Sequence, residues 1–358
     1  MSILQVHSCR KSKGWLKISV SVVCFGLLVW MIWKSDPEVL WNHMLLMGWQ
    51  TLVLCVGLWF VIYVLNALSW GMIVWSVSGV RIPYIDILRY TISGYALNYI
   101  TPLGMLGGEP YRIWALKKQT DLGHATSSVM LYAMMHFCSH FLFWIIGCLV
   151  ALSMFVCSSV WKCSLLLAVV ALCVFLLFVF FQGFKLGFVE ALFASLSRMP
   201  LLGPKVASWF EKNRVLIASI DQSIRSLPNL YKGKLLLSLF LELAARLVGC
   251  LEFCFLGLAI GFSIDYVEAL CISAFSSLFA NVLFFSPLQM GTREGGIVWS
   301  LWLIGYGADF DNLLPLAVAV SLGTRIREFV WIALGLILII INEYMGDSPR
   351  NNNESSNT

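Results

Sequence analysis

The sequence predicts an all-α polytopic membrane protein with about six spanning helices and two re-entrant hairpins, broken by glycine and proline and arranged as an inverted repeat. Three observations predict this fold: an apolar composition, six long hydrophobic stretches, and two similar segments that contain glycine and proline. Of the 358 residues, 59% are hydrophobic and only 12% are charged. So few polar side chains cannot cover a water-soluble globule, and lipid must therefore surround most of the chain.

Six stretches reach or approach the roughly 20 apolar residues that cross a hydrocarbon core about 30 Å thick. They comprise residues 16–33, 51–76, 126–154, 163–183, 235–261 and 313–342. The first stretch leads into a Trp-Met-Ile-Trp-Lys run without a small-x-small cleavage pattern, so we interpret it as an uncleaved anchor. The remaining parts are a cytoplasmic N-terminus (1–15) and a polar, disordered tail (343–358), which leaves 16–342 as a single integral membrane domain.

The basic residues predict the orientation, because loops rich in Lys and Arg stay on the cytoplasmic side. Four basic residues lie before the first span or at its start, five flank residues 84–112, eight lie in residues 185–234, and Arg350 lies in the tail. The loops expected on the other side are mainly acidic, with Asp36, Glu38, Asp265, Glu268, Asp309 and Asp311. We therefore expect a multi-pass protein of the inner (cytoplasmic) membrane with both termini in the cytoplasm.

Residues 84–112 are apolar enough to indicate another span, but a crossing would leave the basic residues that follow on the outer side. We therefore predict a re-entrant hairpin that enters from the cytoplasm and returns to it. Residues 266–306 are bounded by acidic residues and interrupted in the middle by a proline and three glycines. This pattern predicts a second hairpin, which enters from the outside.

The two hairpins resemble each other in sequence. The first reads NYITPLGMLGGEPYR from Asn98 to Arg112, and the second reads NVLFFSPLQMGTREGG from Asn281 to Gly296. Each contains an Asn, then Pro-Leu-x-Met, then glycines together with a Glu and an Arg. The similarity, in opposite topological contexts, predicts that the two segments occupy equivalent places in a duplicated architecture.

Each hairpin has one predicted span before it and one after it, which gives two repeats of about residues 51–154 and 235–342. A span and an amphipathic cytoplasmic linker at 185–234 join them. Inverted repeats with broken half-helices at matching positions indicate a transporter whose substrate site lies near the bilayer midplane. The repeats therefore predict such a site where the hairpins meet.

Glycine and proline explain why a site should form there. Proline removes a backbone donor and glycine permits non-helical turns, so backbone groups are left unpaired at membrane depth. They are tolerated only where protein or a water-filled cavity satisfies them. Half-helix N-termini at such a cavity carry positive partial charge, which favours a phosphate or a carboxylate. The residues expected to break the hairpins are Pro102, Gly107, Gly108, Pro287, Gly291 and Gly295.

Charged side chains at membrane depth give the second indication of a site. An Arg at a helix centre costs roughly 2.5–3.5 kcal/mol, so Arg325, in the middle of its span, needs a partner or a wet cavity. Its candidate partners are Glu242, Glu252 and Glu294. We predict substrate contacts from seven residues: Asn98, Glu109, Arg112, Asn281, Arg293, Glu294 and Arg325. Glu242 and Arg246, one helical turn apart, are interpreted instead as a structural ion pair.

His136 and His140 lie one turn apart, which is also the spacing of a metal-binding pair. No local motif supplies a third ligand, so we interpret them as satisfied polar residues of the bundle and expect neither a metal nor a cofactor. The linker 185–234 combines eight basic and three acidic residues with helical apolar spacing, as expected of amphipathic helices on an anionic inner leaflet. No nucleic-acid partner is expected.

The chain resembles the flippase-like membrane domain of lysylphosphatidylglycerol synthases and its stand-alone relatives. The resemblance rests on residues 98–112, on Pro287 with the Gly-Thr-Arg-Glu-Gly-Gly run after it, and on Arg325, and it covers about residues 20–340. It implies translocation of a lipid. Synthases of this family append a soluble aminoacyl-transferase domain, which we do not expect in these 358 residues, so lysyl transfer is not implied.

The expected function is therefore that of a lipid flippase or transporter, which moves an anionic phospholipid or a polyprenyl-phosphate-linked intermediate across the inner membrane. Two alternatives stay open. One is a membrane-embedded enzyme that acts on a lipid headgroup with His136, His140 and Glu109 as catalytic groups. The other is a non-transporting subunit that partners a synthase of an envelope lipid or glycan pathway.

Overall fold

The computed structural model describes residues 37–78, 80–100, 107–155, 159–186, 232–282, 289, 291–305 and 310–346. The helices in these ranges are α2 (Pro37–Val77), α3 (Tyr84–Ile100), α4 (Gly108–Leu116), α5 (Leu122–Met154), α6 (Val160–Leu186), α10 (Lys232–Gly249), α11 (Leu251–Ala259), α12 (Tyr266–Val282), α13 (Thr292–Leu303) and α14 (Phe310–Gly346). Three segments there are long and apolar enough to cross a membrane: Leu45–Val77, Leu122–Met154 and Val160–Gln182. The chain is an all-α polytopic membrane protein, as predicted.

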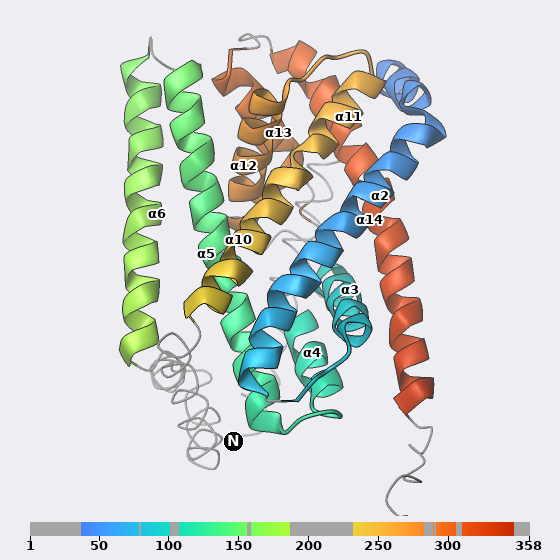
Figure 1. Ribbon diagram of the computed structural model, residues 1–358. Helices are drawn as coiled ribbons and strands as arrows, with labels where there is room; N and C mark the ends of the chain where they lie inside the picture. Colours follow the sequence, from blue (N-terminus) through green and yellow to red (C-terminus); the bar gives the residue numbers. More distant parts are fainter. Residues whose placement is uncertain are drawn as a thin grey trace, which may run out of the picture.

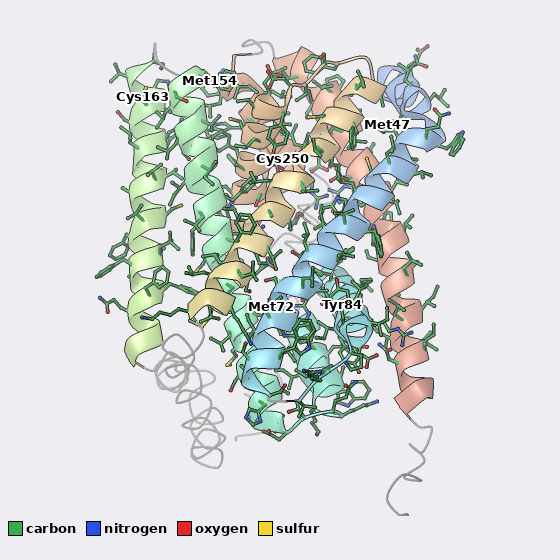
Figure 2. The ribbon with its side chains drawn as sticks, viewed as in Figure 1. Met47, Met72, Tyr84, Met154, Cys163 and Cys250 are labelled. Carbon is green, nitrogen blue, oxygen red and sulfur yellow. The ribbon has the colours of Figure 1, made fainter. Side chains whose placement is uncertain are left out.

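Most predicted spans correspond to helices. Four of them lie within the single helices α2, α5, α6 and α14. The predicted span 235–261 is divided at Cys250 into α10 and α11 (Figure 2). Helix α14 continues to Gly346, so the first residues of the predicted tail (343–358) are helical. The predicted span 16–33, most of the linker 185–234 and the tail after residue 346 lie outside the described residues.

Two pairs of short helices form the predicted hairpins, with α3 packed against α4 and α12 packed against α13. The longest of these four helices has 17 residues, or about 26 Å at 1.5 Å per residue, which is shorter than a typical hydrocarbon core of about 30 Å. Figure 1 shows α3 and α4 in the lower half of the molecule and α12 and α13 in the upper half. The two helix pairs therefore lie in opposite halves of the molecule, at the residues where the two hairpins are predicted.

The first hairpin closes through a contact between glycines. A Cβ on Gly108, the first residue of α4, would overlap the carbonyl oxygen of Gly94 in α3 and lie 2.6 Å from its carbonyl carbon. Backbone atoms cannot move aside as a flexible side chain can, so only glycine permits this crossing. In the second hairpin, a Cβ on Gly296 would lie 2.9 Å from the Cα of Ser276. Both hairpins thus bring helix backbones together at a glycine.

Two apolar clusters fill the two ends of the molecule and leave a polar layer between them. Met47 of the upper cluster and Tyr84, which packs against the lower cluster, mark these ends in Figure 2. Along α5, buried residues from Val129 to Met135 belong to the lower cluster and those from Phe143 to Ala151 to the upper cluster. The stretch of α5 between them carries two histidines. The polar layer therefore lies near the middle of the spanning helices.

The close contact of Gly94 and Gly108 predicts a selective loss of stability. Replacing Gly108 with Ala should lower the thermal unfolding temperature of the detergent-solubilised protein, because the added methyl group overlaps the α3 backbone and overpacking costs about 1–3 kcal/mol. Gly295→Ala is the matched control, since a Cβ at that helical position has nothing within 4 Å. Equal unfolding temperatures for the two variants would contradict the backbone contact.

Candidate functional site

A cavity of about 360 Å³ lies in the polar layer between the two apolar clusters. Every described helix except α6 contributes to its lining. The α3/α4 hairpin reaches it from one end and the α12/α13 hairpin from the other (Figure 1). The volume falls within the range of about 300–1,000 Å³ that small-ligand sites occupy. The cavity thus lies where the repeat pattern predicts a site.

Helices α4 and α13 begin at this cavity and run toward opposite ends of the molecule (Figure 1). Glu109, the second residue of α4, and Arg293, the second residue of α13, both line it. The N-terminus of each helix carries positive partial charge on its unpaired backbone N–H groups. Two such N-termini at one cavity favour an anionic group there.

The lining carries equal numbers of opposite charges. Its arginines are Arg112, Arg246, Arg293 and Arg327, and its glutamates are Glu109, Glu242, Glu252 and Glu328. Two histidines, His136 and His140, also face the cavity. When both histidines are neutral, the four positive and four negative charges cancel. The cavity is therefore polar and charged, but its lining has no excess of positive charge.

Two of the arginines belong to one ion-pair network. Arg327 donates from Nε and Nη2 to the two carboxylate oxygens of Glu252, each at 2.9 Å. Trp59 donates from Nε1 to Glu252 at 2.9 Å, and its ring centre lies 3.7 Å from the Cζ of Arg327. Arg293 donates to Glu328 at 2.6 Å. These contacts tie α2, α11, α13 and α14 together around the cavity.

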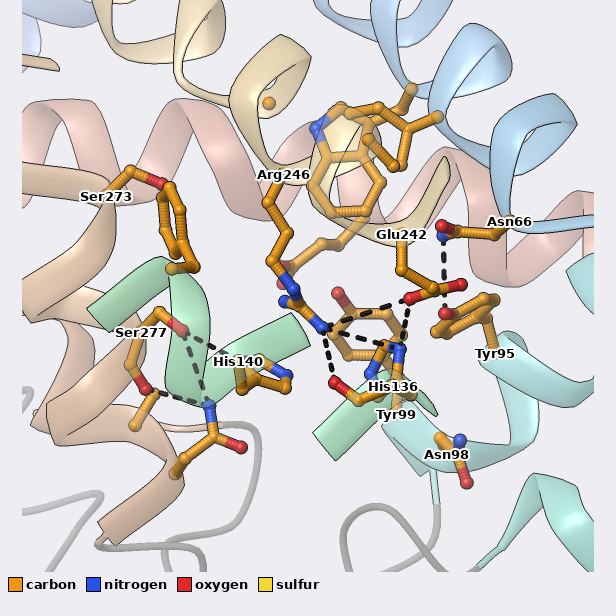
Figure 3. Close-up of a pocket in the computed structure, with 18 of the residues that line it drawn as sticks. Asn66, Tyr95, Asn98, Tyr99, His136, His140, Glu242, Arg246, Ser273 and Ser277 are labelled. Atoms are coloured by element: carbon orange, nitrogen blue, oxygen red, sulfur yellow. Dashed lines mark hydrogen bonds and ion pairs between the residues drawn. The ribbon is translucent and has the colours of Figure 1, made fainter. Parts of the chain in front are cut away.

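A second cluster joins α5 to α10, as Figure 3 shows. Nδ1 of His136 lies 2.7 Å from Oε2 of Glu242, and Nη2 of Arg246 lies 4.0 Å from the same oxygen. Arg246 also donates to the backbone carbonyl of His136 at 3.2 Å. His140, one turn along α5, meets the hydroxyl of Ser277 at 3.4 Å. The carboxylate is therefore paired with one histidine of the two.

Arg112 is only 2% exposed and is surrounded by aromatic rings. Its Cζ lies 4.9 Å from the ring centre of Tyr95, 5.1 Å from that of Tyr132 and 5.6 Å from that of Trp70. Nη1 lies 3.7 Å from Glu109, whereas Nε and Nη2 are buried without a hydrogen-bond partner in the described part of the chain. Buried N–H groups normally have an acceptor. Arg112 is therefore a lining residue with two donors that lack an acceptor among the described residues, although both atoms are buried and Nε lies against Gly94 of α3.

The structure brings five of the seven predicted substrate residues to the cavity: Asn98, Glu109, Arg112, Asn281 and Arg293. Asn98 closes the first hairpin, because its Oδ1 accepts from the backbone N–H of Gly108 at 2.6 Å and its Nδ2 donates to Glu109 at 3.4 Å. Asn281 donates to the carbonyl of Ser277 in its own helix at 2.8 Å. Asn98 therefore joins the two helices of the first hairpin, whereas the hydrogen bonds of Asn281 stay within α12.

Arg325 and Glu294 require a correction, since neither lines the cavity. Nη2 of Arg325 donates to Oε1 of Glu294 at 2.7 Å, and Ser321 donates to the same oxygen at 2.6 Å. The reason is the helical period: positions 325 and 327 are about 200° apart around α14, so Arg325 faces away when Arg327 faces the cavity. Glu294, one of the three candidate partners of Arg325, is the partner that the structure selects.

The predicted hairpin breaks also need revision. Gly291 precedes α13 with φ 76°, a conformation that favours glycine. Gly107 has ordinary helical angles, and Gly108 and Gly295 lie within α4 and α13, so these three do not break a helix through their own conformation. The role of Gly108 is the close contact with α3. Pro102 and Pro287 lie outside the described residues.

The sequence analysis missed part of the lining. Glu242 and Arg246 are more than a structural pair, since both face the cavity and Glu242 also holds His136. The available signal was the presence of charge inside a predicted span, which marks a functional site by default. The partners are distant in sequence, however: 106 positions separate His136 from Glu242, and 75 separate Glu252 from Arg327. Local spacing does not reveal such pairs.

Within the ranges that the structure describes, no three His, Cys, Asp or Glu side chains are placed to hold a metal ion. His136 and His140 contact Glu242 and Ser277 instead. The described cysteines are free thiols, and most of them are buried. The contacts of the two histidines are therefore hydrogen bonds to other helices.

The sequence matches the family model described as "Lysylphosphatidylglycerol synthase TM region" over residues 14–336. The chain belongs to this family. The matched range contains both hairpins and every residue that lines the cavity. No curated protein matches the sequence. The family assignment and the apolar helices support a membrane protein related to lipids.

The pair of Glu294 and Arg325 predicts a rescue experiment. Arg325→Gln should reduce the yield of folded protein, because it leaves a buried carboxylate without its ion partner, a loss of about 3–5 kcal/mol. Adding Glu294→Gln should restore much of the yield, since both charges are then absent. Fluorescence-detected size-exclusion chromatography of the two single variants and the double variant measures this. If the double variant loses as much folded protein as the two single variants together, the pairing of Glu294 with Arg325 is contradicted.

Proposed function

We propose that the protein is a lipid flippase or transporter, which moves an anionic phospholipid or a lipid-linked intermediate across the membrane. The observation that carries the proposal is the state of Arg112, which is buried, lines the central cavity and has two N–H groups without an acceptor among the described residues. A guanidinium offers paired donors that match the oxygens of a phosphate or a carboxylate. Because both atoms are buried among aromatic rings and Gly94, an anionic headgroup reaches them in this proposal when the side chains around Arg112 move aside.

The free-energy cost of placing charged side chains around the cavity supports a role in transport. Ionised side chains at membrane depth are expensive and mark substrate pathways. Buried ion pairs add little to stability, because well-packed apolar residues of similar volume often do as well or better. Eight charged residues around one cavity therefore point to a ligand that needs them. The position of the cavity between two oppositely directed hairpins supports access from both ends.

The two substrate classes share the group that the cavity recognises. An anionic phospholipid and a polyprenyl-phosphate-linked intermediate both carry a phosphate on a long apolar chain. The donors of Arg112 and the N-termini of α4 and α13 are suited to that phosphate. In this proposal the headgroup enters the cavity of about 360 Å³ and the apolar chains remain in the surrounding bilayer.

We further propose that the lower end of the molecule in Figure 1 faces the cytoplasm at the inner membrane. Basic residues gather at the lower ends of the helices, with Arg81, Arg89, Lys117, Lys118, Lys232 and Lys234. The upper connections carry Glu38, Asp265 and Glu268 beside Lys162. Loops rich in Lys and Arg remain in the cytoplasm. Helix α14 ends at the lower end, so this orientation gives a cytoplasmic C-terminus, and a span at 16–33, as the sequence predicts, would give a cytoplasmic N-terminus.

The role of Arg112 predicts a loss of lipid movement. Purified protein in liposomes should exchange a fluorescent phosphatidylglycerol between leaflets, and Arg112→Gln should abolish the exchange because the charged pair of donors is gone. Arg112→Lys should retain only part of it, since Lys cannot make a bidentate contact. The fraction of fluorescence that a membrane-impermeant quencher removes over time measures the exchange.

Lys118→Gln is the matched control for charge. It removes one positive charge after the same hairpin, but Lys118 is exposed and its Nζ lies 4.0 Å from the ring centre of Trp114. This variant should move lipid at the normal rate. Full exchange by Arg112→Gln at normal folded yield would place the substrate path elsewhere. A chemically altered headgroup without exchange would favour the membrane-embedded enzyme.

The orientation predicts a labelling pattern. In a cysteine-free background, Lys162→Cys and Asp265→Cys should react with a membrane-impermeant maleimide added outside intact cells. Lys118→Cys should react only after the membrane is permeabilised, because the basic flank of the first hairpin stays inside. Outside labelling at position 118 would refute the proposed orientation of the first hairpin.

A further inference from the structure

The cavity contains a group that the proposed headgroup contacts leave unused, the pair of His136 and Glu242. Nδ1 of the histidine lies 2.7 Å from Oε2 of the glutamate, whose side chain is 1% exposed. Histidine is the side chain whose charge ordinarily changes between pH 5 and 8. This pair is therefore placed to exchange a proton inside the same cavity that is proposed to receive the headgroup.

Other charged and titratable groups surround this pair on several sides. On its own helix, the ring of His140 lies 5.0 Å from that of His136. From α10, Nη2 of Arg246 lies 3.4 Å from Nδ1 of His136. The groups that face the pair are Arg112 on α4, Tyr95 on α3, Tyr132 and His140 on α5, and Arg246 on α10. The nearby polar residues of α2 and α12 are the uncharged Asn66 and Ser277.

The net charge of the cavity lining determines whether a bound anion needs an added positive charge. Without a ligand, the four arginines and four glutamates of the lining cancel when both histidines are neutral. A phosphate monoanion at Arg112 adds a full negative charge, which the partial charges of the two helix N-termini offset only in part and which no described lining residue cancels. Uncompensated charge is costly at membrane depth, because water screens it poorly there. One added positive charge near the headgroup would restore the balance.

We propose that the pair of His136 and Glu242 binds a proton together with each anionic headgroup, so that the protein couples lipid movement to proton movement. The inference rests on the proposed function and names its coupling ion. Before binding, the neutral imidazole donates its Nδ1–H to the carboxylate of Glu242. With the headgroup bound, a second proton on Nε2 converts the imidazole to imidazolium. No other bond forms or breaks.

The neighbours of the pair suit this role. Arg246 keeps a positive charge beside Glu242 in both states, so the carboxylate stays ionised and the added proton resides on His136. Among the described residues His140 has no carboxylate partner and meets Ser277 instead, so the geometry selects one of the two histidines. The coupling has a defined sign: anion binding takes up a proton, and the affinity for the anionic lipid therefore rises as pH falls.

Calorimetry of the full chain in detergent tests the coupling. A short-chain phosphatidylglycerol is titrated into the protein in two buffers with different enthalpies of ionisation, which yields the number of protons taken up per bound lipid. For the wild-type protein at neutral pH we expect about one proton. His136→Gln should lower this number toward zero and remove the pH dependence of the affinity. Gln can still donate a hydrogen bond to Glu242, so the variant keeps the helix contact.

His140→Gln is the matched control, because it removes the other histidine of the same helix face and should leave the proton number unchanged. Wild-type binding without proton uptake would overturn the coupling and leave the proposed function intact. Equal uptake by wild type and His136→Gln would overturn the assignment to this pair. No binding by the wild type, at any pH between 5 and 8, would overturn the proposed function and this inference with it.

Discussion

Ionised side chains in the middle of a bilayer must find partners on other helices, and this requirement organises the molecule. Glu252 receives Arg327 and Trp59, each at 2.9 Å, which joins α11 to α14 and α2. Glu242 holds His136 at 2.7 Å, which joins α10 to α5. These contacts form a polar layer with apolar clusters on both sides. The layer fixes where the two hairpins meet, and the cavity is the space that the pairs leave open.

The fold was largely predictable because its signals are local. Basic residues constrain which side of the membrane a loop occupies, and glycine and proline constrain the backbone, whatever lies nearby. The two hairpins followed from these constraints and are present as α3/α4 and α12/α13. The role of individual glycines was less predictable. Gly291 has the positive φ expected of a break, whereas Gly108 is required because Gly94 lies against it.

The site was only partly predictable, because the rotation of each helix about its axis decides which of its side chains point into the cavity. Arg325 and Arg327 are two positions apart in one apolar helix, and nothing local indicates which of them turns toward the cavity. That choice is made by Glu252 and Glu294, which lie 75 and 31 positions earlier in the chain. For the same reason His136 acquires a carboxylate partner and His140 does not. A charged side chain within a span indicates that it has an ion partner, and the tertiary structure decides which residue that partner is.

The contacts between helices of the first and second halves of the chain have a further consequence, because the ribosome makes the first half earlier. Trp59 on α2 and His136 on α5 lie in the first half of the chain, but their carboxylate partners lie 193 and 106 residues later. A ribosome therefore delivers α2 and α5 to the membrane well before α10 and α11 exist. During that interval the nascent half presents polar groups at membrane depth without their final partners, which is costly in lipid. The polar groups of the first half therefore cost less at membrane depth once Glu242 and Glu252 have been made than before.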